Sequence, residues 1–461
     1  MTQSFDALII GAGQAGPPLT GRLTAAGMKV ALIERHLFGG TCVNTGCTPT
    51  KTLVASAYAA HLARRAADYG VVISGAIAVD MALVKARTNA VVANSRSGVE
   101  AWLSSMEHLT VFRGQARFES ANTLRVGDEL LTAPQIFINV GGRARVPEMP
   151  GVQEIEYLTN TSMLALDSLP RHLVIVGGSY IGLEFAQIYR RFGAAVTVVE
   201  KGPRLVSRED EDVSAAIRDM LEAEGIQVRV GAECIAFTPH ADGASVHLDC
   251  ANGDPEVIGS HVLLAVGRQP NTDDLGLDRA GIVTDKHGYI TVDDQLRTSV
   301  PGIWALGDCN GRGAFTHTSY NDFEIVAANL LDGEARRVSD RIPAYALYTD
   351  PPLGRVGMTE AQARATGRPL LMGTRPMTKV GRAIEKGETQ GFIKILADAE
   401  TQRILGAAIL GVGGDEAIHG LIDIMTADQP YTTLQKAVPI HPTVSELLPT
   451  VVGEMQPLLP I

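Results

Sequence analysis

The chain has 461 residues, of which 45% are hydrophobic and 20% charged, a composition typical of a globular protein with about three domains. Lys and Arg total 40 against 51 Asp and Glu, which gives a net charge of −11, and no basic block interrupts this balance. The charge therefore argues against nucleic acid and against an anionic membrane as partners.

Other features of the sequence predict a cytoplasmic protein. The chain holds no uncharged apolar run of about 18 residues, so we expect no transmembrane helix. A strand predicted at residues 6–10 leaves no room for a signal peptide. Five scattered cysteines, an odd number, argue against a secreted disulfide scaffold.

The first predicted unit is a strand, a glycine turn, a helix and a second strand. The apolar run Ala7–Ile10 leads into a turn with Gly11, Gly13 and Gly16, and a second apolar run ends at Glu34. Glycines let backbone N–H groups approach a pyrophosphate at the N-terminus of a helix, and the carboxylate binds ribose hydroxyls. The pattern predicts a dinucleotide site.

Two cysteines, Cys42 and Cys47, follow this unit in a loop rich in Gly and Thr. In a regular helix the Cα atoms of residues five apart lie about 8 to 9 Å from each other, whereas a disulfide needs less than about 7 Å. A bridge therefore requires a distortion, which Gly46 permits, and strained bridges tend to be labile or catalytic. Thr48 and Pro49 are predicted as the N-cap and first residue of a helix, which would lower the pKa of Cys47. The alternative, two buried inert cysteines, is disfavoured by the flanking residues.

The design of the first unit recurs at residues 173–200. An apolar strand leads into a second glycine turn and a helix, and another apolar strand ends at Glu200. In each unit the carboxylate lies 23 positions after the first glycine. In the second unit, Ser179 stands where a middle glycine is usual. The glycines of the second turn are Gly177, Gly178 and Gly182.

Two nucleotide sites and a redox-prone cysteine pair suggest an electron path from nicotinamide to flavin to disulfide. Because the cysteine pair follows the first site directly, that site is expected to hold the flavin nucleotide FAD. The second site is then expected to hold NADH or NADPH.

Taken together, these motifs resemble the class I pyridine nucleotide-disulfide oxidoreductases, the family of glutathione reductase, dihydrolipoamide dehydrogenase and mercuric reductase. The resemblance covers essentially the whole chain, and further matching motifs follow in family order at 136–141, 265–271, 298–308 and 441–446. It implies an α/β fold with two Rossmann-like domains, for FAD and NAD(P), and a C-terminal α+β dimerisation domain. The expected divisions are residues 1–150 for FAD and the cysteine pair, 151–270 for NAD(P), 271–342 for a return to the FAD domain, and 343–461 for the interface domain.

The resemblance also implies site residues by position. Cys47 would face the flavin as the charge-transfer thiolate, Cys42 would attack the substrate, and Tyr180 would gate the nicotinamide pocket. The implied catalytic residues are Cys42, Cys47, Lys51, Glu184, His441 and Glu446, with Lys51 paired to Glu184 near the flavin and His441 an acid/base held by Glu446. The implied FAD-binding residues are Gly11, Gly13, Gly16, Glu34, Gly40, Thr41, Lys51, Ala116, Gly141, Arg268, Asp308, Phe315 and Thr316. The implied NAD(P)-binding residues are Gly177, Gly178, Tyr180, Gly182, Glu200 and Gly267.

The remaining three cysteines are assigned no site. Cys234, Cys250 and Cys309 lack metal-ligand spacing and are interpreted as structural, so no metal site is expected. Segments 391–396 and 404–410 predict a hairpin. In the family the His/Glu dyad reaches the cysteine pair of the other subunit, which implies a homodimer.

The electron acceptor is the least determined part of this interpretation. The last residues contain no cysteine, which argues against the terminal relay of mercuric reductases and against the large thioredoxin reductases. The tract 348–360 and the Thr-Pro-Thr-Lys51 ending resemble the mercuric-reductase-like group, which includes the reactive-chlorine-resistance flavoproteins that reduce copper(II). We therefore expect a small-molecule disulfide or a metal ion as acceptor, with dihydrolipoamide dehydrogenase as an alternative.

Alternatives outside thiol chemistry stay open at this point. One is a flavin-dependent NADH:acceptor oxidoreductase in which the cysteines take no part, and another is a flavin-binding subunit without catalysis. For the reductant, Glu200 favours NADH because a carboxylate repels the 2′-phosphate of NADPH, whereas Lys201 and Arg204 leave dual use open.

Overall fold

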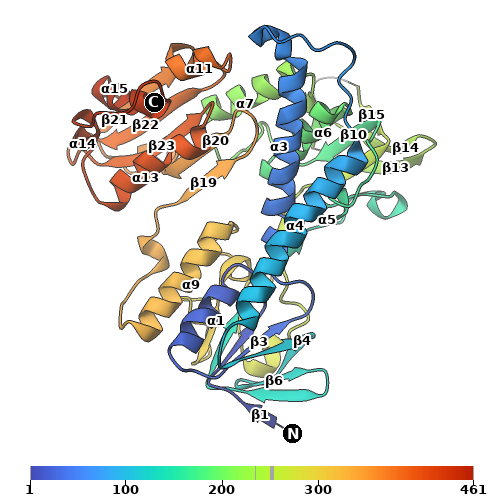
Figure 1. The fold of residues 1–461 in the computed structure, drawn as a ribbon, viewed down its shortest axis with the longest axis vertical. Coiled ribbons are helices and arrows are strands. Elements are labelled where there is room, and N and C mark those ends of the chain that lie inside the picture. Colours follow the sequence, from blue (N-terminus) through green and yellow to red (C-terminus); the bar gives the residue numbers. More distant parts are fainter. Residues whose placement is uncertain (1, 234, 250–253, 460–461) are drawn as a thin grey trace.

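The computed structural model describes residues 2–233, 235–249 and 254–459, so Cys234 and Cys250 lie outside the described residues. Figure 1 shows three modules, which we call the N-terminal, central and C-terminal modules and distinguish by their main sheets. The N-terminal module has a five-stranded parallel sheet, the central module a four-stranded parallel sheet, and the C-terminal module a six-stranded antiparallel sheet. The predicted α/β class with two Rossmann-like domains is confirmed.

The sheet of the N-terminal module runs in the order β18-β8-β2-β3-β4. Its central strands are apolar and buried on both faces, as expected for a parallel sheet covered by other layers. Helices α1 (Gly16–Ala25) and α9 (Thr316–Leu331) pack on each other, and a second sheet, β1-β7-β6-β5, shares the same apolar core. The strands of both sheets are β1 (Thr2–Ser4), β2 (Ala7–Ile10), β3 (Val30–Glu34), β4 (Leu109–Arg113), β5 (Ala116–Ser120), β6 (Thr123–Val126), β7 (Glu129–Thr132), β8 (Gln135–Ile138) and β18 (Ile303–Ala305).

The central module repeats this design on a smaller scale. Its parallel sheet runs β12-β11-β10-β16, with helices α6 (Tyr180–Phe192) and α7 (Glu211–Ala223) packed against it. A three-stranded antiparallel sheet, β13-β14-β15, covers the other side of the same strands. The strands are β10 (His172–Val176), β11 (Ala195–Val199), β12 (Gln227–Arg229), β13 (Ala236–His240), β14 (Gly243–His247), β15 (Glu256–Gly259) and β16 (His261–Leu264).

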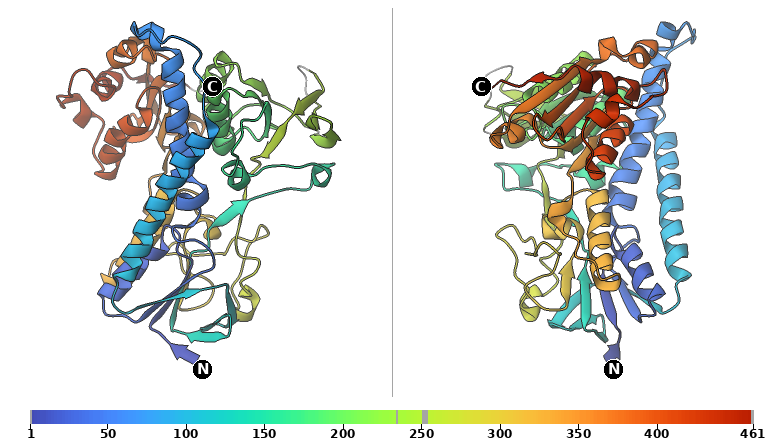
Figure 2. Two further views of the ribbon diagram at one scale, coloured as in Figure 1. Left: turned by 45° about the vertical axis from the view of Figure 1, so that its right-hand side comes forward. Right: turned by 90° about the vertical axis from the view of Figure 1, so that its left-hand side faces the viewer.

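Two connections join these modules. The chain passes from the first to the second through β9 (Gly142–Ala144) and returns through β17 (Arg268–Pro270), and the two strands pair antiparallel. Two long helices, α3 (Cys47–Arg64) and α4 (Met81–Ser104), run side by side from the N-terminal sheet to the central module (Figures 1 and 2). Because α3 also packs on α6, the cysteine segment is fixed against both nucleotide-type units.

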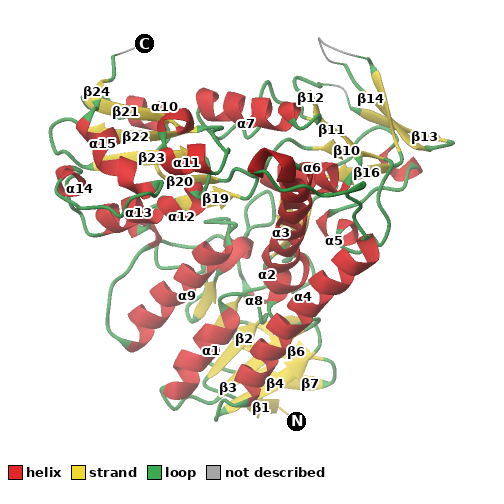
Figure 3. Ribbon diagram, turned by 45° about the horizontal axis from the view of Figure 1, so that its top comes forward, coloured by secondary structure: helices red, strands yellow, loops and turns green. Residues whose placement is uncertain are grey.

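The C-terminal module packs beside the central one and completes the fold (Figure 3). Its sheet runs β19-β20-β23-β22-β21-β24, and the predicted hairpin is confirmed as β22 paired with β23. Short helices, including α11 (Gly381–Glu385), α13 (His419–Thr426) and α15 (Leu448–Gly453), cover the sheet. The strands are β19 (Ala344–Leu347), β20 (Leu353–Gly357), β21 (Leu370–Pro376), β22 (Phe392–Asp398), β23 (Ile404–Leu410) and β24 (Gln456–Pro457).

Within residues 2–233, 235–249 and 254–459, no helix combines the length and the apolar character that crossing a lipid bilayer requires. The same residues contain no group of three or more His, Cys, Asp or Glu side chains placed to hold a metal ion.

The contact between the central and C-terminal modules contains a buried ion-pair triad. The guanidinium of Arg191, on α6, lies 2.7 Å from Glu224 and 2.6 Å from Asp350, and its side chain is 5% exposed. Asp350 precedes β20, so this triad ties the two modules together.

We expect Arg191→Leu to lower the stability of the fold by about 3–5 kcal/mol, because two partly buried carboxylates lose the guanidinium that pairs with both of them. Arg171→Leu is the matched control, since Arg171 pairs with Asp242 at the surface and its loss should cost about 1 kcal/mol or less. The midpoint of thermal unfolding measures both variants. Equal midpoints in the two variants would contradict a stabilising role for the triad.

Candidate active site

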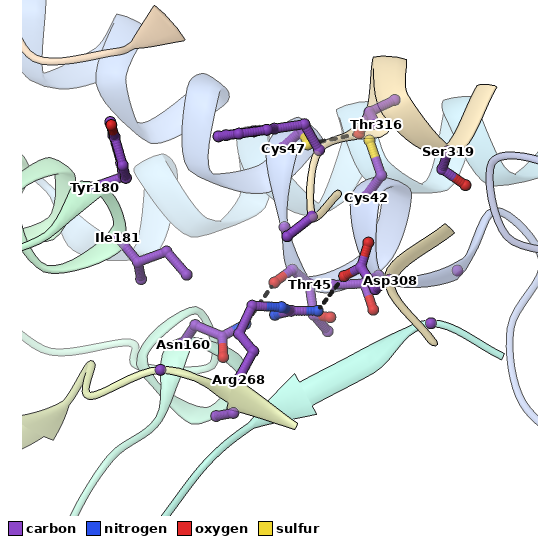
Figure 4. Close-up of a pocket in the computed structure, with 18 of the residues that line it drawn as sticks. Cys42, Thr45, Cys47, Asn160, Tyr180, Ile181, Arg268, Asp308, Thr316 and Ser319 are labelled. Carbon is purple, nitrogen blue, oxygen red and sulfur yellow. Dashed lines mark hydrogen bonds and ion pairs between the residues drawn. The ribbon is translucent and has the colours of Figure 1, made fainter. Parts of the chain in front are cut away.

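A single connected cavity of about 1750 Å³ lies where the N-terminal and central modules face each other. It exceeds the usual range of about 300–1,000 Å³ for sites that take one small molecule. Both glycine turns and both cysteines line it, and Figure 4 shows Cys42, Cys47, Tyr180 and Thr316 around it.

The two glycine turns have the same steric requirement. Gly11 has φ +103°, and a Cβ there would lie 2.3 Å from the carbonyl oxygen of Asn139, while a Cβ at Gly16 would lie 2.2 Å from that of Gly11. In the second turn, a Cβ at Gly177 or Gly182 would lie 2.4 or 2.1 Å from a carbonyl oxygen. Only glycine allows the helix to pack this closely on the strand, which leaves the turn open toward the cavity.

The acidic residue of each unit is hydrogen-bonded to the backbone of its own glycine turn. Glu34 accepts a hydrogen bond from the backbone N–H of Ala12 at 2.8 Å, and Glu200 accepts one from Gly178 at 2.6 Å. A backbone N–H two residues further along the chain donates to the second oxygen of each carboxylate. Both carboxylates are therefore fixed at the edge of the cavity, at the position where a ribose would lie next to a turn-bound pyrophosphate.

The residues opposite the turns leave room for nucleotides. A Cβ at Gly141 or Gly267 would meet no atom of the described residues within 4 Å, and both glycines line the cavity. Asp308 also lines it and is held by Arg268 at 3.1 Å (Figure 4). Two carboxylate-bearing glycine turns facing one large cavity fit FAD and a nicotinamide nucleotide.

The cysteine pair lies at a break between two helices. Helix α2 (Gly40–Thr45) ends before Gly46, whose φ of −138° and ψ of −116° are not helical, and α3 begins at Cys47. The prediction that Gly46 permits a distortion is confirmed. The prediction of Thr48 as N-cap is wrong, because Gly46 occupies that position and a Cβ there would lie 2.9 Å from the carbonyl oxygen of Thr41. Tertiary contact with the preceding helix, rather than local side-chain capping, thus sets the start of α3.

The pKa values of the two thiols are shifted in opposite directions. Cys42 and Cys47 are both free thiols here, and the hydrogen bond from Cys42 is the largest cause that lowers the pKa of Cys47 to about 6. Thr316, the first residue of α9, lies 3.2 Å from the Cys47 sulfur and also lowers this pKa, as does the charge of Lys51. The pKa of Cys42 is raised, first by its hydrogen bond to Cys47 and then by burial. Cys47 therefore carries the thiolate while Cys42 keeps its proton.

One turn beyond Cys47, Lys51 connects α3 to α6. Its ammonium lies 2.7 and 2.9 Å from the two oxygens of Glu184, so the predicted pair is formed. The ring of Tyr348 lies 4.5 Å from the same ammonium, and its backbone N–H donates to Glu184 at 3.1 Å. The sequence assigns no role to Tyr348, whose aromatic side chain is the one feature that points to this cation–π contact.

The predicted acid/base dyad forms but does not reach the cysteines of its own chain. The Nδ1 atom of His441 lies 2.8 Å from Glu446, and the histidine side chain is 81% exposed. Neither residue lines the cavity. The dyad is thus available to another molecule rather than to the cysteine pair of the same chain.

The other predicted residues fall into two groups. Those that line the cavity are Gly11, Gly13, Glu34, Gly40, Thr41, Ala116, Gly141, Gly177, Tyr180, Glu200, Gly267, Arg268, Asp308, Phe315 and Thr316. Gly16, Gly178 and Gly182 lie behind the turns, where they allow close packing. Cys309 is fully buried, and burial raises its pKa to about 12, which makes it an inert thiol.

Fold and cavity together define a two-nucleotide flavoprotein with a dithiol. The pyridine nucleotide-disulphide oxidoreductase model matches residues 5–322, and the dimerisation domain of that family matches residues 343–452. The chain belongs to the pyridine nucleotide-disulfide oxidoreductase family, whose enzymes use FAD and NAD(P)H.

Individual relatives narrow the reaction class. The chain is 37% identical to the probable pyridine nucleotide-disulfide oxidoreductase RclA of Escherichia coli over 96% of this chain and 98% of that one. It is 32% identical to the mercuric reductase of Streptomyces lividans and 31% identical to the dihydrolipoyl dehydrogenase of Thermus scotoductus, in both cases over at least 94% of each chain. The structure of the HOCl-induced flavoprotein disulfide reductase RclA aligns with a TM-score of 0.88 at 36% identity, over 97% of this chain and 99% of that one. The chain is therefore a flavoprotein reductase of the disulfide and metal-ion type.

The acid strength of Cys47 gives a testable expectation. Since the thiolate is the deprotonated form, its ultraviolet absorbance in the anaerobically reduced protein should rise with pH through about 6. Thr316→Val removes one hydrogen bond to the thiolate, so the midpoint should move up by about one pH unit. Thr366→Val, an exposed residue outside the cavity, serves as control and should leave the midpoint in place. An unchanged midpoint in Thr316→Val would show that this hydroxyl does not stabilise the thiolate.

Proposed function

We propose that the chain passes electrons from NADH through FAD to the Cys42–Cys47 disulfide, and from the resulting dithiol to a small disulfide or a metal ion. The observation that carries this proposal is the Cys47 thiol, which lies in the same cavity as both glycine turns and has a pKa lowered to about 6. Support for a metal-ion acceptor comes from RclA, of which a structure is described as a Cu(II) complex. That structure aligns with a TM-score of 0.88 at 36% identity.

The proposed division of labour follows the geometry of the two sulfur atoms. FAD, held at the first glycine turn, supplies two-electron transfer between the nicotinamide and the disulfide. Cys47 keeps the negative charge beside Thr316, and Cys42 loses its proton to attack the acceptor. With a disulfide acceptor, the Cys42 sulfur forms a mixed disulfide as the acceptor S–S bond breaks. Cys47 then attacks Cys42 and releases the second thiolate, and two protons complete the two product thiols.

Other residues hold these groups in place in the proposal. Lys51 and Glu184 fix the start of α3 against α6, and Tyr180 covers the nicotinamide part of the second site. His441, oriented by Glu446, exchanges protons with the Cys42 sulfur of a partner subunit in a homodimer. The match of residues 343–452 to the family's dimerisation domain and the exposure of His441 support this arrangement. The cytoplasm is the proposed location, since five scattered cysteines, an odd number, do not suit a secreted disulfide scaffold.

Substitution of each cysteine separates the two roles. In anaerobic titrations with NADH, we expect a long-wave thiolate-to-flavin band in the wild type and in Cys42→Ser, which retains the Cys47 thiolate, but not in Cys47→Ser. Acceptor reduction should fall about 100-fold or more in both variants, because neither can re-form the disulfide.

The acceptors to compare are lipoamide, glutathione disulfide, Hg(II) and Cu(II). Full acceptor turnover by Cys42→Ser would instead support an NADH:acceptor reductase without thiol chemistry. A clear preference for lipoamide would support dihydrolipoamide dehydrogenase, the activity of the relative from Thermus scotoductus.

The choice between the two nicotinamide nucleotides is proposed to depend on Glu200. Both of its oxygens accept backbone hydrogen bonds, which fixes the charge at the edge of the second site. Arg204 is held by Glu211 at 2.9 Å and is thereby partly neutralised. NADH is therefore the proposed reductant.

Glu200→Gln retains a hydrogen-bond acceptor but removes the charge, so the ratio of kcat/KM for NADPH over NADH should rise about tenfold. Glu222→Gln, which removes a charge from the exposed face of α7, is the control and should leave the ratio unchanged. Steady-state kinetics with both nucleotides at equal ionic strength measure the ratio. A wild-type preference for NADPH, or no change in Glu200→Gln, would contradict this assignment.

A further inference from the structure

A buried carboxylate, Glu209, lies beside the cavity at a point where all three modules meet. Its side chain is fully buried, although it is a charged residue in the segment that leads from β11 into α7. Residues 206–208, immediately before it, line the cavity. A buried acid is costly unless it is paired, so its partners indicate what it holds.

Two tyrosine hydroxyls donate to one oxygen of this carboxylate. Tyr345, on β19 of the C-terminal module, lies 2.6 Å from Glu209 Oε1, and Tyr180, the first residue of α6, lies 3.1 Å from the same atom. Burial, followed by the negative charge of Glu209, raises the pKa of Tyr180 and of Tyr345, so both hydroxyls keep their protons and donate.

The second oxygen of Glu209 faces a guanidinium. Oε2 lies 3.6 Å from Nη1 of Arg355 and accepts no hydrogen bond from the described residues. Arg355 is on β20 and is the direct cross-strand partner of Tyr345. Since directly paired residues of an antiparallel ladder share one face of the sheet, the hairpin β19–β20 presents a hydroxyl and a guanidinium to Glu209 as a fixed pair.

The rings of the two tyrosines pack with a third aromatic residue at the cavity wall. Tyr345 stacks on Phe315, with ring centroids 5.5 Å apart and planes 10° from parallel. Tyr180 meets both rings edge-on, at 6.3 Å from Phe315 and 5.6 Å from Tyr345. Phe315 directly precedes Thr316, which contacts the Cys47 sulfur, so this cluster reaches from the second nucleotide site to the cysteine pair.

We propose that Glu209, Tyr345 and Arg355 form a hydrogen-bond latch that holds Tyr180 over the nicotinamide part of the second site. This inference rests on the proposed function, in which that site binds NADH. Glu209 is a positioning residue, because it acts on the nucleotide through Tyr180 and lines no part of the cavity itself.

The three contacts of Glu209 explain how such a latch can open at modest cost. When Tyr180 turns away, the carboxylate loses one of its two hydroxyl donors but keeps Tyr345 and Arg355. The buried charge is therefore never left without a partner, and opening breaks one hydrogen bond to it together with the edge-on ring contacts of Tyr180. NADH binds to the open state, so the fraction of closed molecules reduces its apparent affinity.

Two tyrosine-to-phenylalanine variants test the latch, because they should change the apparent dissociation constant of NADH in opposite directions. Tyr180→Phe removes the hydroxyl that moves, so the apparent dissociation constant of NADH should fall about tenfold. Tyr345→Phe leaves Tyr180 as the only hydroxyl donor to Oε1, so opening becomes harder and the same constant should rise by a few-fold, about three. The measurement is the dependence of the anaerobic flavin reduction rate on NADH concentration. Changes in the same direction in both variants would overturn the latch.

A ligand without nicotinamide separates the latch from a general effect on the pocket. ADP-ribose occupies the pyrophosphate and ribose part of the second site only, so its inhibition constant should be the same in the wild type, Tyr180→Phe and Glu209→Gln. Glu209→Gln should itself lower the apparent dissociation constant of NADH, because a neutral acceptor binds Tyr180 less strongly. Equal changes for NADH and ADP-ribose would overturn the proposal.

Two further variants complete the test. The double variant Glu209→Gln/Tyr180→Phe should bind NADH no more tightly than Tyr180→Phe alone, because both substitutions act on the same hydrogen bond, between Tyr180 and Glu209. Additive effects of the two substitutions on the NADH dissociation constant would reject the latch. Asp212→Asn is the control within the same charge network, where Asp212 pairs with Lys394 and contacts neither tyrosine, and its NADH constant should match the wild type. Failure of the proposed function is distinguishable, because the wild type would then hold flavin that NADH does not reduce at any concentration.

Discussion

The ion pair between Lys51 and Glu184 is the interaction on which the geometry of the site depends. It joins the N-terminal part of α3 to α6, and Glu184 is only 6% exposed, so its charge needs a partner in place. Lys51 lies four residues, about one helical turn, beyond Cys47, and the pair therefore fixes the height and rotation of the cysteine segment against the central module. The positive charge also contributes to the low pKa of Cys47, so one contact serves both position and reactivity.

The two nucleotide units share one local arrangement, in which a carboxylate is hydrogen-bonded to a glycine turn. A carboxylate at the end of the second strand accepts N–H groups from its own glycine turn, which holds the turn open and places negative charge where ribose hydroxyls donate. The repetition explains how one chain forms two adjacent nucleotide sites around one cavity. The structure adds a third element, the C-terminal hairpin β19–β20, which supplies Tyr345 to the cavity wall and places Arg355 behind it, against Glu209.

The sequence predicted those features whose cause is local. Glycine turns, the strands that flank them and the break at Gly46 follow from sterics within a few residues, and the structure agrees. Thr48 was predicted as a cap because its side chain suits that position, but the close passage of Thr41 sets the start of α3 instead. Tyr345 and Glu209 were not predicted, because only the register of β19 with β20 and the packing of three modules bring them together. The His441–Glu446 contact follows from a spacing of five residues, whereas its distance from the cysteines depends on the tertiary fold.

The site residues on the two sides of the cysteine pair are held to different degrees. On the side proposed for the electron donor, the glycine turns, the carboxylates and the Lys51–Glu184 pair are fixed by short contacts. On the side proposed for the acceptor, Cys42 keeps its proton, and His441, the proposed acid/base, is exposed rather than enclosed by its own chain. A mercuric reductase and dihydrolipoyl dehydrogenases share 31–32% identity with this chain over nearly their full length, although their names give different acceptors. Under the proposed function, substitutions around Cys42 are expected to alter the acceptor while the contacts that hold the glycine turns and the Lys51–Glu184 pair stay in place.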